Sequence, residues 1–208
     1  MEIEIPTGAA YILQQLNKHG YEAYIVGGCV RDSLLGKQPN DWDITTSAKP
    51  EEVKAIFHRT IDTGIQHGTV TVLVDREILD DGSGSPASHT DYAFEVTTYR
   101  VDGVYTDHRR PESVCFTASL EEDLKRRDFT INAMAYNPEQ GVIDIFGGQE
   151  DLEKGIIRCV GEASERFDED ALRILRAVRF AAQLDFVIED QTREAMRDQA
   201  KFLKDISA

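Results

Sequence analysis

The stretch from Tyr24 to Thr46 reads YIVGGCVRDSLLGKQPNDWDITT, and the interpretation of the chain starts from it. Its apolar beginning predicts a strand over Tyr21–Val26, and the spacing of Val30–Leu35 predicts a short helix. Between the two, Gly27 and Gly28 have no Cβ atom, so a phosphate can approach the backbone closely. We therefore expect a strand, a glycine turn and a helix whose N-terminus attracts anions.

A pair of acidic residues follows in the sequence Asp41-Trp42-Asp43-Ile44. On a strand, side chains alternate between two faces, so the two aspartates would share one face while their apolar neighbours enter a core. Two carboxylates this close repel each other unless a cation lies between them, and hard oxygen ligands suit Mg²⁺. Taken singly, an Asp-x-Asp pattern is also common in solvated loops, and a glycine pair in ordinary turns.

Together, these pieces resemble motif A of the polymerase-β-like nucleotidyltransferases, in the form found in bacterial class II CCA-adding enzymes and related poly(A) polymerases. The resemblance rests on three pieces of sequence: Gly27–Asp32, Leu34–Gly36 and Asp41–Ile44. It implies that Asp41 and Asp43 are catalytic and hold two Mg²⁺ ions. It also implies triphosphate contacts from the glycine turn and the arginine after it: Gly27, Gly28 and Arg31.

Length and composition describe an ordinary globular protein. The 208 residues, 41% hydrophobic and 29% charged, suffice for one large domain or one domain and part of a second. No apolar run approaches the ~20 residues of a membrane span, and the start of the chain lacks the basic region of a secretory signal. Cys29, Cys115 and Cys159 are odd in number and far apart, which favours a reducing cytosol. We expect a cytoplasmic protein with no membrane contact, and no protein partner is implied.

The formal net charge of −15 is unusual for a protein that binds RNA, because phosphate binding needs a basic surface. Two explanations stay open. Either positive charge is concentrated around the site, or the part that holds RNA lies outside these residues. Whether Arg109 and Arg110, in the irregular segment Val101–Asp123, contact RNA also stays open.

A third acidic candidate lies on a pair of predicted strands. Gly68–Val74 is rich in β-branched residues, and Tyr92–Arg100 predicts the strand that returns beside it. Between them, Asp80–Asp91 has the composition of a loop. Nucleotidyltransferases of the resembled superfamily often carry a third carboxylate on such a strand, which makes Glu95 a catalytic candidate. A glutamate that only faces solvent fits the same pattern.

The stretch KRRDFTINAMAY, from Lys125 to Tyr136, places three cations and an aspartate before what reads as an apolar helix. An acidic residue in the first turn of a solvated helix explains this spacing without any ligand. The stretch nevertheless resembles motif B of the same family. That resemblance implies that Arg127 contacts the bound nucleotide and that Asp128 reaches its ribose. A carboxylate can accept hydrogen bonds from both ribose hydroxyls.

The sequence VIDIFGG, Val142–Gly148, resembles motif C, which we interpret as a joint between domains and not as a catalytic element. We therefore expect a catalytic head over residues 1–154 and an all-helical neck over residues 155–208. Members of the family continue with body and tail domains that hold tRNA, so the chain resembles a head with part of a neck.

The segment Arg166–Leu184, RFDEDALRILRAVRFAAQL, has the spacing of one helix. One row of this helix is charged: Asp170, Arg173, Arg176 and Arg179. A parallel row is apolar: Leu172, Leu175 and Val178. We expect the apolar row to pack and the charged row to face a cleft. An exposed helix with salt bridges fits the same spacing.

The same segment resembles motif D of class II enzymes, Glu-Asp-x-x-Arg. Asp accepts hydrogen bonds and Arg donates them. Cytosine and adenine each present an amino donor beside a ring-nitrogen acceptor, whereas uracil and guanine present the reverse. The resemblance thus implies that Asp170 and Arg173 select C and A and reject U and G without a template. It also implies that Arg176 and Arg179 line the nucleotide pocket.

As a whole, the sequence predicts an α+β fold with a small mixed sheet, flanking helices and a helical neck. The resemblance implies an enzyme that adds CMP and AMP, from CTP and ATP, to the 3′ end of tRNA and releases pyrophosphate. Two alternatives stay open. One is a poly(A) polymerase or A-adding enzyme of the same family, and the other is a nucleotide-binding module without turnover.

Overall fold

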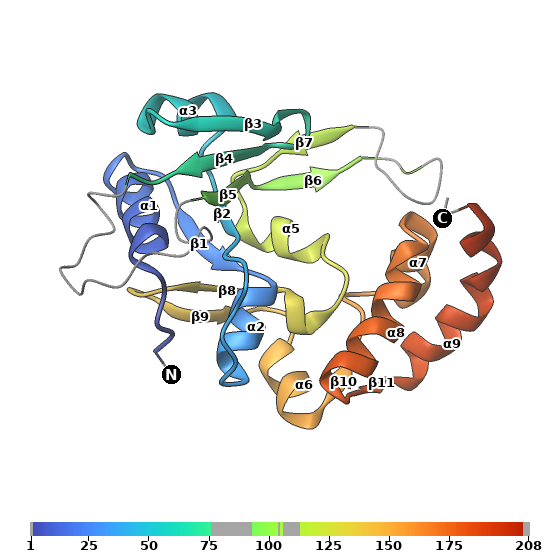
Figure 1. Cartoon of the computed structure of the whole chain (residues 1–208). Helices are drawn as coiled ribbons and strands as arrows, with labels where there is room; N and C mark the ends of the chain where they lie inside the picture. The colour runs from blue at the N-terminus through green and yellow to red at the C-terminus, as the bar shows by residue number, and fades with distance from the viewer. Residues whose placement is uncertain (1, 76–92, 104, 106–112, 206–208) are drawn as a thin grey trace.

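The computed structural model describes residues 2–75, 93–103, 105 and 113–205 (Figure 1). The predicted loop over Asp80–Asp91 and any RNA contact of Arg109 and Arg110 therefore lie outside the described residues. Within the described part of the chain, no helix combines the length and the apolar character that crossing a membrane requires.

A seven-stranded mixed sheet forms the centre of the protein, in the order β3-β4-β5-β2-β1-β8-β9. Its strands are β1 (Ala23–Val26), β2 (Ile44–Thr46), β3 (Thr60–Gly64), β4 (Thr69–Leu73), β5 (Ala93–Thr98), β8 (Met134–Asn137) and β9 (Gly141–Asp144). Neighbouring strands are antiparallel except β2 and β5, which run parallel. The predicted α+β class with a mixed sheet is therefore confirmed.

The two faces of the sheet pack against different helices, because alternate residues of a strand point to opposite faces. On one face, Ile25 enters the main hydrophobic core together with Leu16 of helix α1 (Thr7–Lys18). On the other face, Val26 packs in a smaller core with helix α5 (Leu120–Lys125). Helices α2 and α3 and a separate hairpin complete this part: α2 (Gly28–Leu34), α3 (Pro50–Ile56), β6 (Arg100–Asp102) and β7 (Val114–Phe116).

The predicted strand over Asp41–Ile44 begins later than expected. Strand β2 starts at Ile44, so Asp41, Trp42 and Asp43 lie in the segment before it. The backbone is still tied to the sheet there, since the nitrogen of Val26 donates to the carbonyl of Asp43 at 3.0 Å. The two aspartates are thus held next to the sheet without belonging to a strand.

The apolar helix expected after Asp128 is wrong. Residues Thr130–Asn132 form a short 3-10 turn, η3, and the apolar run continues as strand β8. All four residues of β8 are buried, because the strand lies between β1 and β9. A short apolar run has the same composition in a buried strand as in a buried helix, so the pattern alone does not separate them.

The C-terminal part lies at the opposite end of the molecule from α1 (Figure 1). Its elements are α6 (Gly148–Lys154), β10 (Ile156–Ile157), α7 (Ala163–Glu169), α8 (Leu172–Leu184), β11 (Val187–Ile188), α9 (Asp190–Gln199) and the 3-10 turn η4 (Ala200–Asp205). The expected all-helical neck is therefore wrong in one respect, because β10 and β11 pair in parallel. Asp185, with φ of 59°, ends α8 in a left-handed turn that brings the chain back beside β10.

The expected single helix over Arg166–Leu184 is also wrong, because the chain breaks between α7 and α8. Asp170 has an extended backbone, with φ of −141° and ψ of 100°. Its Oδ1 accepts a hydrogen bond from the nitrogen of Leu172 at 2.9 Å, which caps the start of α8. The aspartate of the predicted motif is thus the residue at the break.

Two of the three residues in the apolar row expected to pack on α8 are exposed instead, while Leu172 is half-buried. Leu175 and Val178 are 49% and 53% exposed, whereas Ile174 and Phe180 are buried. The ring of Phe180 lies edge-on to Phe129, with 5.9 Å between their centres. Residues on both sides of position 154 thus share one core, and the predicted division into head and neck stays a prediction.

Candidate functional site

One cavity of about 630 Å³ brings together segments that are far apart in the sequence. Its lining includes every residue predicted for the site except Glu95: Gly27, Gly28, Arg31, Asp41, Asp43, Arg127, Asp128, Asp170, Arg173, Arg176 and Arg179. These residues come from α2 and the glycine before it, from the segment before β2, from the turn between α5 and β8, and from α8 and the aspartate that caps it. Motifs that were recognised separately therefore face one space.

The glycine turn lies beneath an arginine. Gly27 has φ of +84°, a conformation that residues with a side chain rarely adopt. A Cβ at this position would lie 3.2 Å from Nη1 of Arg127. Helix α2 begins at the next residue, Gly28, which also lines the cavity. A glycine at position 27 is therefore needed both for the turn and for the guanidinium above it.

Arg31 is buried and fixed by its neighbours. Its Nε and Nη2 each lie 2.8 Å from Oδ1 of Asp32, and its Nη1 donates to Oδ1 of Asn132 at 2.7 Å. Its guanidinium carbon lies 5.1 Å from the centre of the Phe180 ring. The position of this positive charge is therefore set before any ligand binds.

The paired aspartates line two cavities at once. Asp41 and Asp43 are exposed in the larger cavity and also line a neighbouring cavity of about 540 Å³, whose wall includes Glu95. The pKa of Asp43 is raised above its ordinary value, mainly because the protein shields its carboxylate from water. The Glu95 and Asp41 carboxylates raise the pKa further, and Arg127 only partly offsets the rise. Three carboxylates that repel one another thus lie where the sequence predicts a cation site.

This set of oxygen donors suits Mg²⁺ that is bound together with a phosphate. Among the described residues, no group of three or more His, Cys, Asp or Glu side chains is arranged to hold a metal alone. Mg²⁺ commonly binds through one or two carboxylates and completes its coordination with substrate phosphates and water. Asp41 and Asp43, facing the same cavity as the glycine turn, fit that pattern.

Asp128 is buried, and its carboxylate is already engaged. Oδ1 accepts from the nitrogen of Phe129 at 2.8 Å and from Nδ2 of Asn132 at 3.2 Å. Oδ2 lies 2.6 Å from both Nε and Nη2 of Arg176. A carboxylate has about four acceptor sites. A ribose hydroxyl that reaches Asp128 therefore has to displace or share the contact with Arg176.

The predicted base-reading pair faces the cavity, and each partner also has a structural contact. Asp170 caps α8, as described above. Arg173 donates to Oε2 of Glu169 at 2.6 Å and to two backbone carbonyls at 3.0 and 3.2 Å. Burial alone would lower the pKa of Arg173, but Glu169, Tyr105 and Asp128 together outweigh it and raise the pKa, so the guanidinium stays charged.

Four further residues line the cavity and were not predicted as part of the site: Arg126, Asn132, Leu172 and Phe180. The guanidinium carbons of Arg176 and Arg179 lie 5.2 and 5.0 Å from the centre of the Phe180 ring, which therefore supports the charged row. Phe180 follows Arg176 by one helical turn, and this spacing was a usable signal. No comparable spacing identifies Asn132, whose role depends on the folded contact with Arg31.

The cavity is more basic than the molecule as a whole. Six arginines and four aspartates line it, although the chain has a net charge of −15. Positive charge is therefore concentrated at the site, as the first of the two explanations for the acidic composition requires.

Comparison with known proteins identifies the family. A family model described as the poly A polymerase head domain matches residues 23–158. The chain belongs to this family. A CCA-adding enzyme of Geobacillus thermodenitrificans (strain NG80-2) is 56% identical over 196 residues, which are 94% of this chain and 45% of that protein. The chain spans less than half of the length of the curated relatives it matches.

Solved structures of relatives share the fold. The Bacillus stearothermophilus CCA-adding enzyme in complex with CTP has a TM-score of 0.82 and 48% identity, over 98% of this chain and 46% of that one. The Thermotoga maritima CCA-adding enzyme complexed with tRNA has a TM-score of 0.69 and 28% identity, over 95% of this chain and 43% of that one. The region shared with each includes both the sheet and the C-terminal helices.

Proposed function

We propose that this chain is the nucleotide-binding and catalytic part of a template-independent tRNA nucleotidyltransferase. It adds CMP and AMP, from CTP and ATP, to the 3′ end of tRNA and releases pyrophosphate. The cavity carries the proposal, because the paired aspartates, the glycine turn and the Asp170–Arg173 pair surround one space of about 630 Å³. The names of the relatives favour CCA addition over poly(A) synthesis within the family.

In this proposal, the two cavities that share Asp41 and Asp43 hold the two substrates. The nucleoside triphosphate enters the arginine-lined cavity, and the acceptor end of the RNA enters the cavity beside Glu95. Asp41 and Asp43 would hold two Mg²⁺ ions, which would supply the Lewis acidity that favours ionisation of the 3′-hydroxyl and stabilises the charge on pyrophosphate. The aspartates place that chemistry on the wall between the substrates, where an in-line attack crosses from one cavity to the other.

The remaining residues bind and orient the nucleotide. Gly27 and Gly28 let the triphosphate approach the backbone, and Arg31 and Arg127 neutralise its charge. Because the contacts of Arg31 are already made, its donors need little reorganisation when the ligand binds. Asp128 binds the ribose after its contact with Arg176 has broken. Arg176 is then free to contact the nucleotide, as is Arg179.

Base selection falls to the pair at the start of α8. Asp170 accepts a hydrogen bond from the amino group of cytosine or adenine, and Arg173 donates one to the adjacent ring nitrogen. Uracil and guanine place a donor and an acceptor in the opposite order, so neither side chain would meet a complementary group on the base. The contact with Glu169 holds Arg173 in a fixed orientation for this task.

The proposal is tested by incubating the chain and Mg²⁺ with each of the four NTPs and a tRNA that ends before its CCA. We expect incorporation from CTP, and from ATP only after CTP has been added, with none from UTP or GTP. Incorporation from ATP alone would indicate an A-adding enzyme or poly(A) polymerase. Nucleotide binding without any pyrophosphate release would indicate a binding module. A surface variant, Asp62→Asn, serves as a control that keeps full activity, because Asp62 pairs with Lys54 away from the cavity.

We also propose a cytoplasmic location and a functional boundary near residues 154–155. The three cysteines are free, as expected in a reducing compartment where tRNA is processed. The glycines Gly147 and Gly155, both with positive φ, flank α6 and allow the chain to change direction there. Because the core continues past residue 154, we expect residues 1–154 expressed alone not to fold stably, so the boundary separates functions and not folding units.

A further inference from the structure

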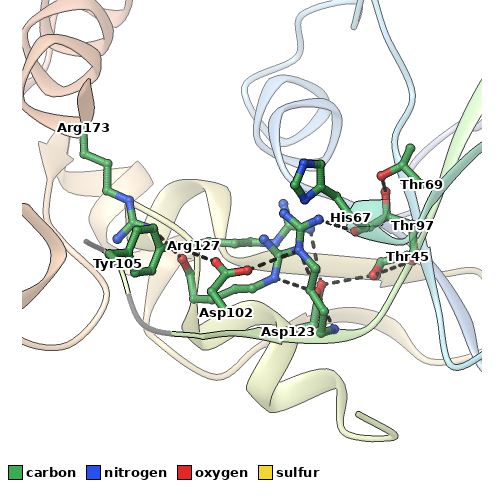
Figure 2. Close-up of polar contacts among 11 residues, drawn as sticks. Thr45, His67, Thr69, Thr97, Asp102, Tyr105, Asp123, Arg127 and Arg173 are labelled. Carbon is green, nitrogen blue, oxygen red and sulfur yellow. Dashed lines mark hydrogen bonds and ion pairs between the residues drawn. The ribbon is translucent and has the colours of Figure 1, made fainter. Parts of the chain in front are cut away.

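A buried carboxylate lies behind the arginines of the cavity and has no part in the mechanism above. Asp123, on α5, has a side chain with 0% exposure and is surrounded by donors (Figure 2). Oδ1 accepts from Nε and Nη2 of Arg126, at 3.0 and 2.8 Å, and from the backbone nitrogen of Arg100 at 3.3 Å. Oδ2 accepts from the hydroxyl of Thr45 at 3.0 Å and from Nη2 of Arg127 at 3.4 Å.

These contacts join two parts of the site that are distant in the sequence. Thr45 lies on β2, two residues after Asp43, whereas Arg126 and Arg127 line the cavity from the other side. One buried carboxylate therefore connects the strand that follows the paired aspartates with the arginines that face them. A buried charge with this many donors is costly to leave unpaired, so the arrangement is held firmly.

Arg127 owes much of its orientation to this contact. Its Nη1 approaches the space that a Cβ on Gly27 would fill, and its Nε is buried without a hydrogen-bond partner among the described residues. Besides Asp123, the carboxylate that attracts it is Asp43. The guanidinium thus lies between two carboxylates, and its bond to Asp123 limits its pairing with Asp43.

We propose that Asp123 is a positioning residue that holds the guanidinium of Arg127 above Gly27, where a nucleotide triphosphate binds, and away from Asp43. The inference rests on the proposed function, since it assigns Arg127 to the triphosphate. In the absence of Asp123, Arg127 pairs with Asp43 instead. That pairing removes a phosphate donor and at the same time occupies one of the two carboxylates that bind Mg²⁺.

The test uses charge-balanced variants, because Asp123→Asn alone leaves buried positive charge without a partner and can prevent folding. D123N is added to R126Q in one pair of proteins and to R127Q in a second pair. Each double variant has lost one negative and one positive charge relative to the unaltered chain. Calorimetry with CTP and Mg²⁺ measures the Kd for the full chain, and urea unfolding of the same samples confirms that each variant is folded.

In the R126Q background, we expect D123N to weaken CTP binding by about tenfold, the usual loss when a residue that orients a ligand contact is removed. In the R127Q background, we expect the Kd to change by less than about twofold, because the residue through which Asp123 acts is already absent. A purely structural role of Asp123 would weaken binding equally in both backgrounds. Equal losses, or no loss in either background, overturn the proposal.

A second comparison removes no charge. D123E, made in the unaltered chain and in R127Q, moves the carboxylate by one methylene and is expected to weaken CTP binding only where Arg127 is present. It decides the question if either double variant does not fold. The unaltered chain is measured alongside. Lack of CTP binding by the unaltered chain contradicts the proposed function, whereas normal binding with equal losses in both backgrounds contradicts only the role of Asp123.

Discussion

The charged residues of the cavity differ in how far the protein already contacts them. Buried charges such as Asp128 have protein partners, whereas the carboxylates of Asp41 and Asp43 are exposed to solvent. Asp128 and Arg173 each have several protein partners at hydrogen-bond distance. Asp41 and Asp43 face open space. Under the proposed function, the aspartates can bind a cation directly, whereas Asp128 has to exchange a protein contact for a ligand contact.

Asp41→Ala is expected to lower nucleotide incorporation roughly a thousandfold. Metal ions supply several kcal/mol of transition-state stabilisation in phosphoryl transfer, and about 4 kcal/mol corresponds to that factor. Single-turnover incorporation of CTP measures the effect. Unchanged incorporation by this variant would remove Asp41 from the catalytic assignment, and the Asp62→Asn control separates the effect from general loss of protein.

Asp123 makes the stability of the protein depend on pH. Burial would raise the pKa of Asp123, but the guanidinium groups of Arg127 and Arg126 outweigh it and lower the pKa below its ordinary value. A carboxyl whose pKa is lower in the folded protein stabilises the fold above its unfolded pKa of about 3.9. This contribution is lost as the pH falls through the folded pKa.

Asp123→Asn is therefore expected to lower the free energy of unfolding by about 3 kcal/mol at neutral pH, the usual cost of breaking a buried ion pair. The difference from the unaltered protein shrinks as the pH falls below about 4, where Asp123 of the unfolded chain becomes protonated. It is lost once the pH has fallen through the lower pKa of Asp123 in the folded protein. Urea unfolding at a series of pH values measures both curves. A difference that stays constant down to the acid limit contradicts the pKa direction.

At the level of whole elements, the break between α7 and α8 explains how one helix packs on the core and also lines the cavity. Because Asp170 caps α8, its carboxylate lies at the beginning of that helix, where the next turn brings in Arg173. The buried stripe of α8 contains Ile174, Ala177 and Phe180. Leu175 and Val178 therefore point away from the core, in contrast to the pattern expected from an unbroken helix.

Two alanine substitutions on α8 distinguish these stripes. Ile174→Ala removes a buried side chain and is expected to lower the free energy of unfolding by about 2–4 kcal/mol. Leu175→Ala, next to it in sequence and 49% exposed, is expected to cost less than about 1 kcal/mol. Urea unfolding of the two variants compares them directly. A larger loss of unfolding free energy for Leu175→Ala than for Ile174→Ala would support the apolar row predicted from the sequence.

Across the whole molecule, the distribution of charge matters more than its sum. The net charge of −15 repels an anionic ligand at long range, while the six arginines of the cavity attract it at short range. Salt screens interactions that extend beyond about 8–10 Å more than it screens contacts. The sign of the salt effect on CTP affinity therefore shows whether long-range repulsion or short-range attraction by the arginines dominates.

Raising NaCl from about 50 to about 500 mM at fixed Mg²⁺ is expected to weaken CTP binding by about three- to tenfold, because the arginines dominate. Cytidine, which has no phosphate, is the matched control and is expected to change little. Calorimetry measures both affinities. Tighter CTP binding at high salt would mean that repulsion by the acidic surface controls the approach of the nucleotide.

The sequence predicted the composition of the site better than the shape of its supports. Gly27, Asp41 and Arg127 were singled out because their stretches resemble motifs A and B of the family, and the structure places all three on one cavity. The start of β2, the strand after Asp128 and the break at Asp170 were missed, since they depend on sheet neighbours and on a side-chain cap that a periodic pattern does not contain. Asp123 was missed for the same reason, because an aspartate in an acidic helix start looks solvated until its arginine partners fold around it.

Asp41 and Asp43 border two chambers, and this partition has a kinetic consequence. If each cavity takes one substrate, as proposed, neither substrate has to leave before the other binds. Either substrate can bind first, and both are bound in a ternary complex before the bond forms. Double-reciprocal plots of rate against the two substrates should then intersect, whereas a mechanism in which pyrophosphate left and the nucleotidyl group stayed on the enzyme before the RNA bound would give parallel lines.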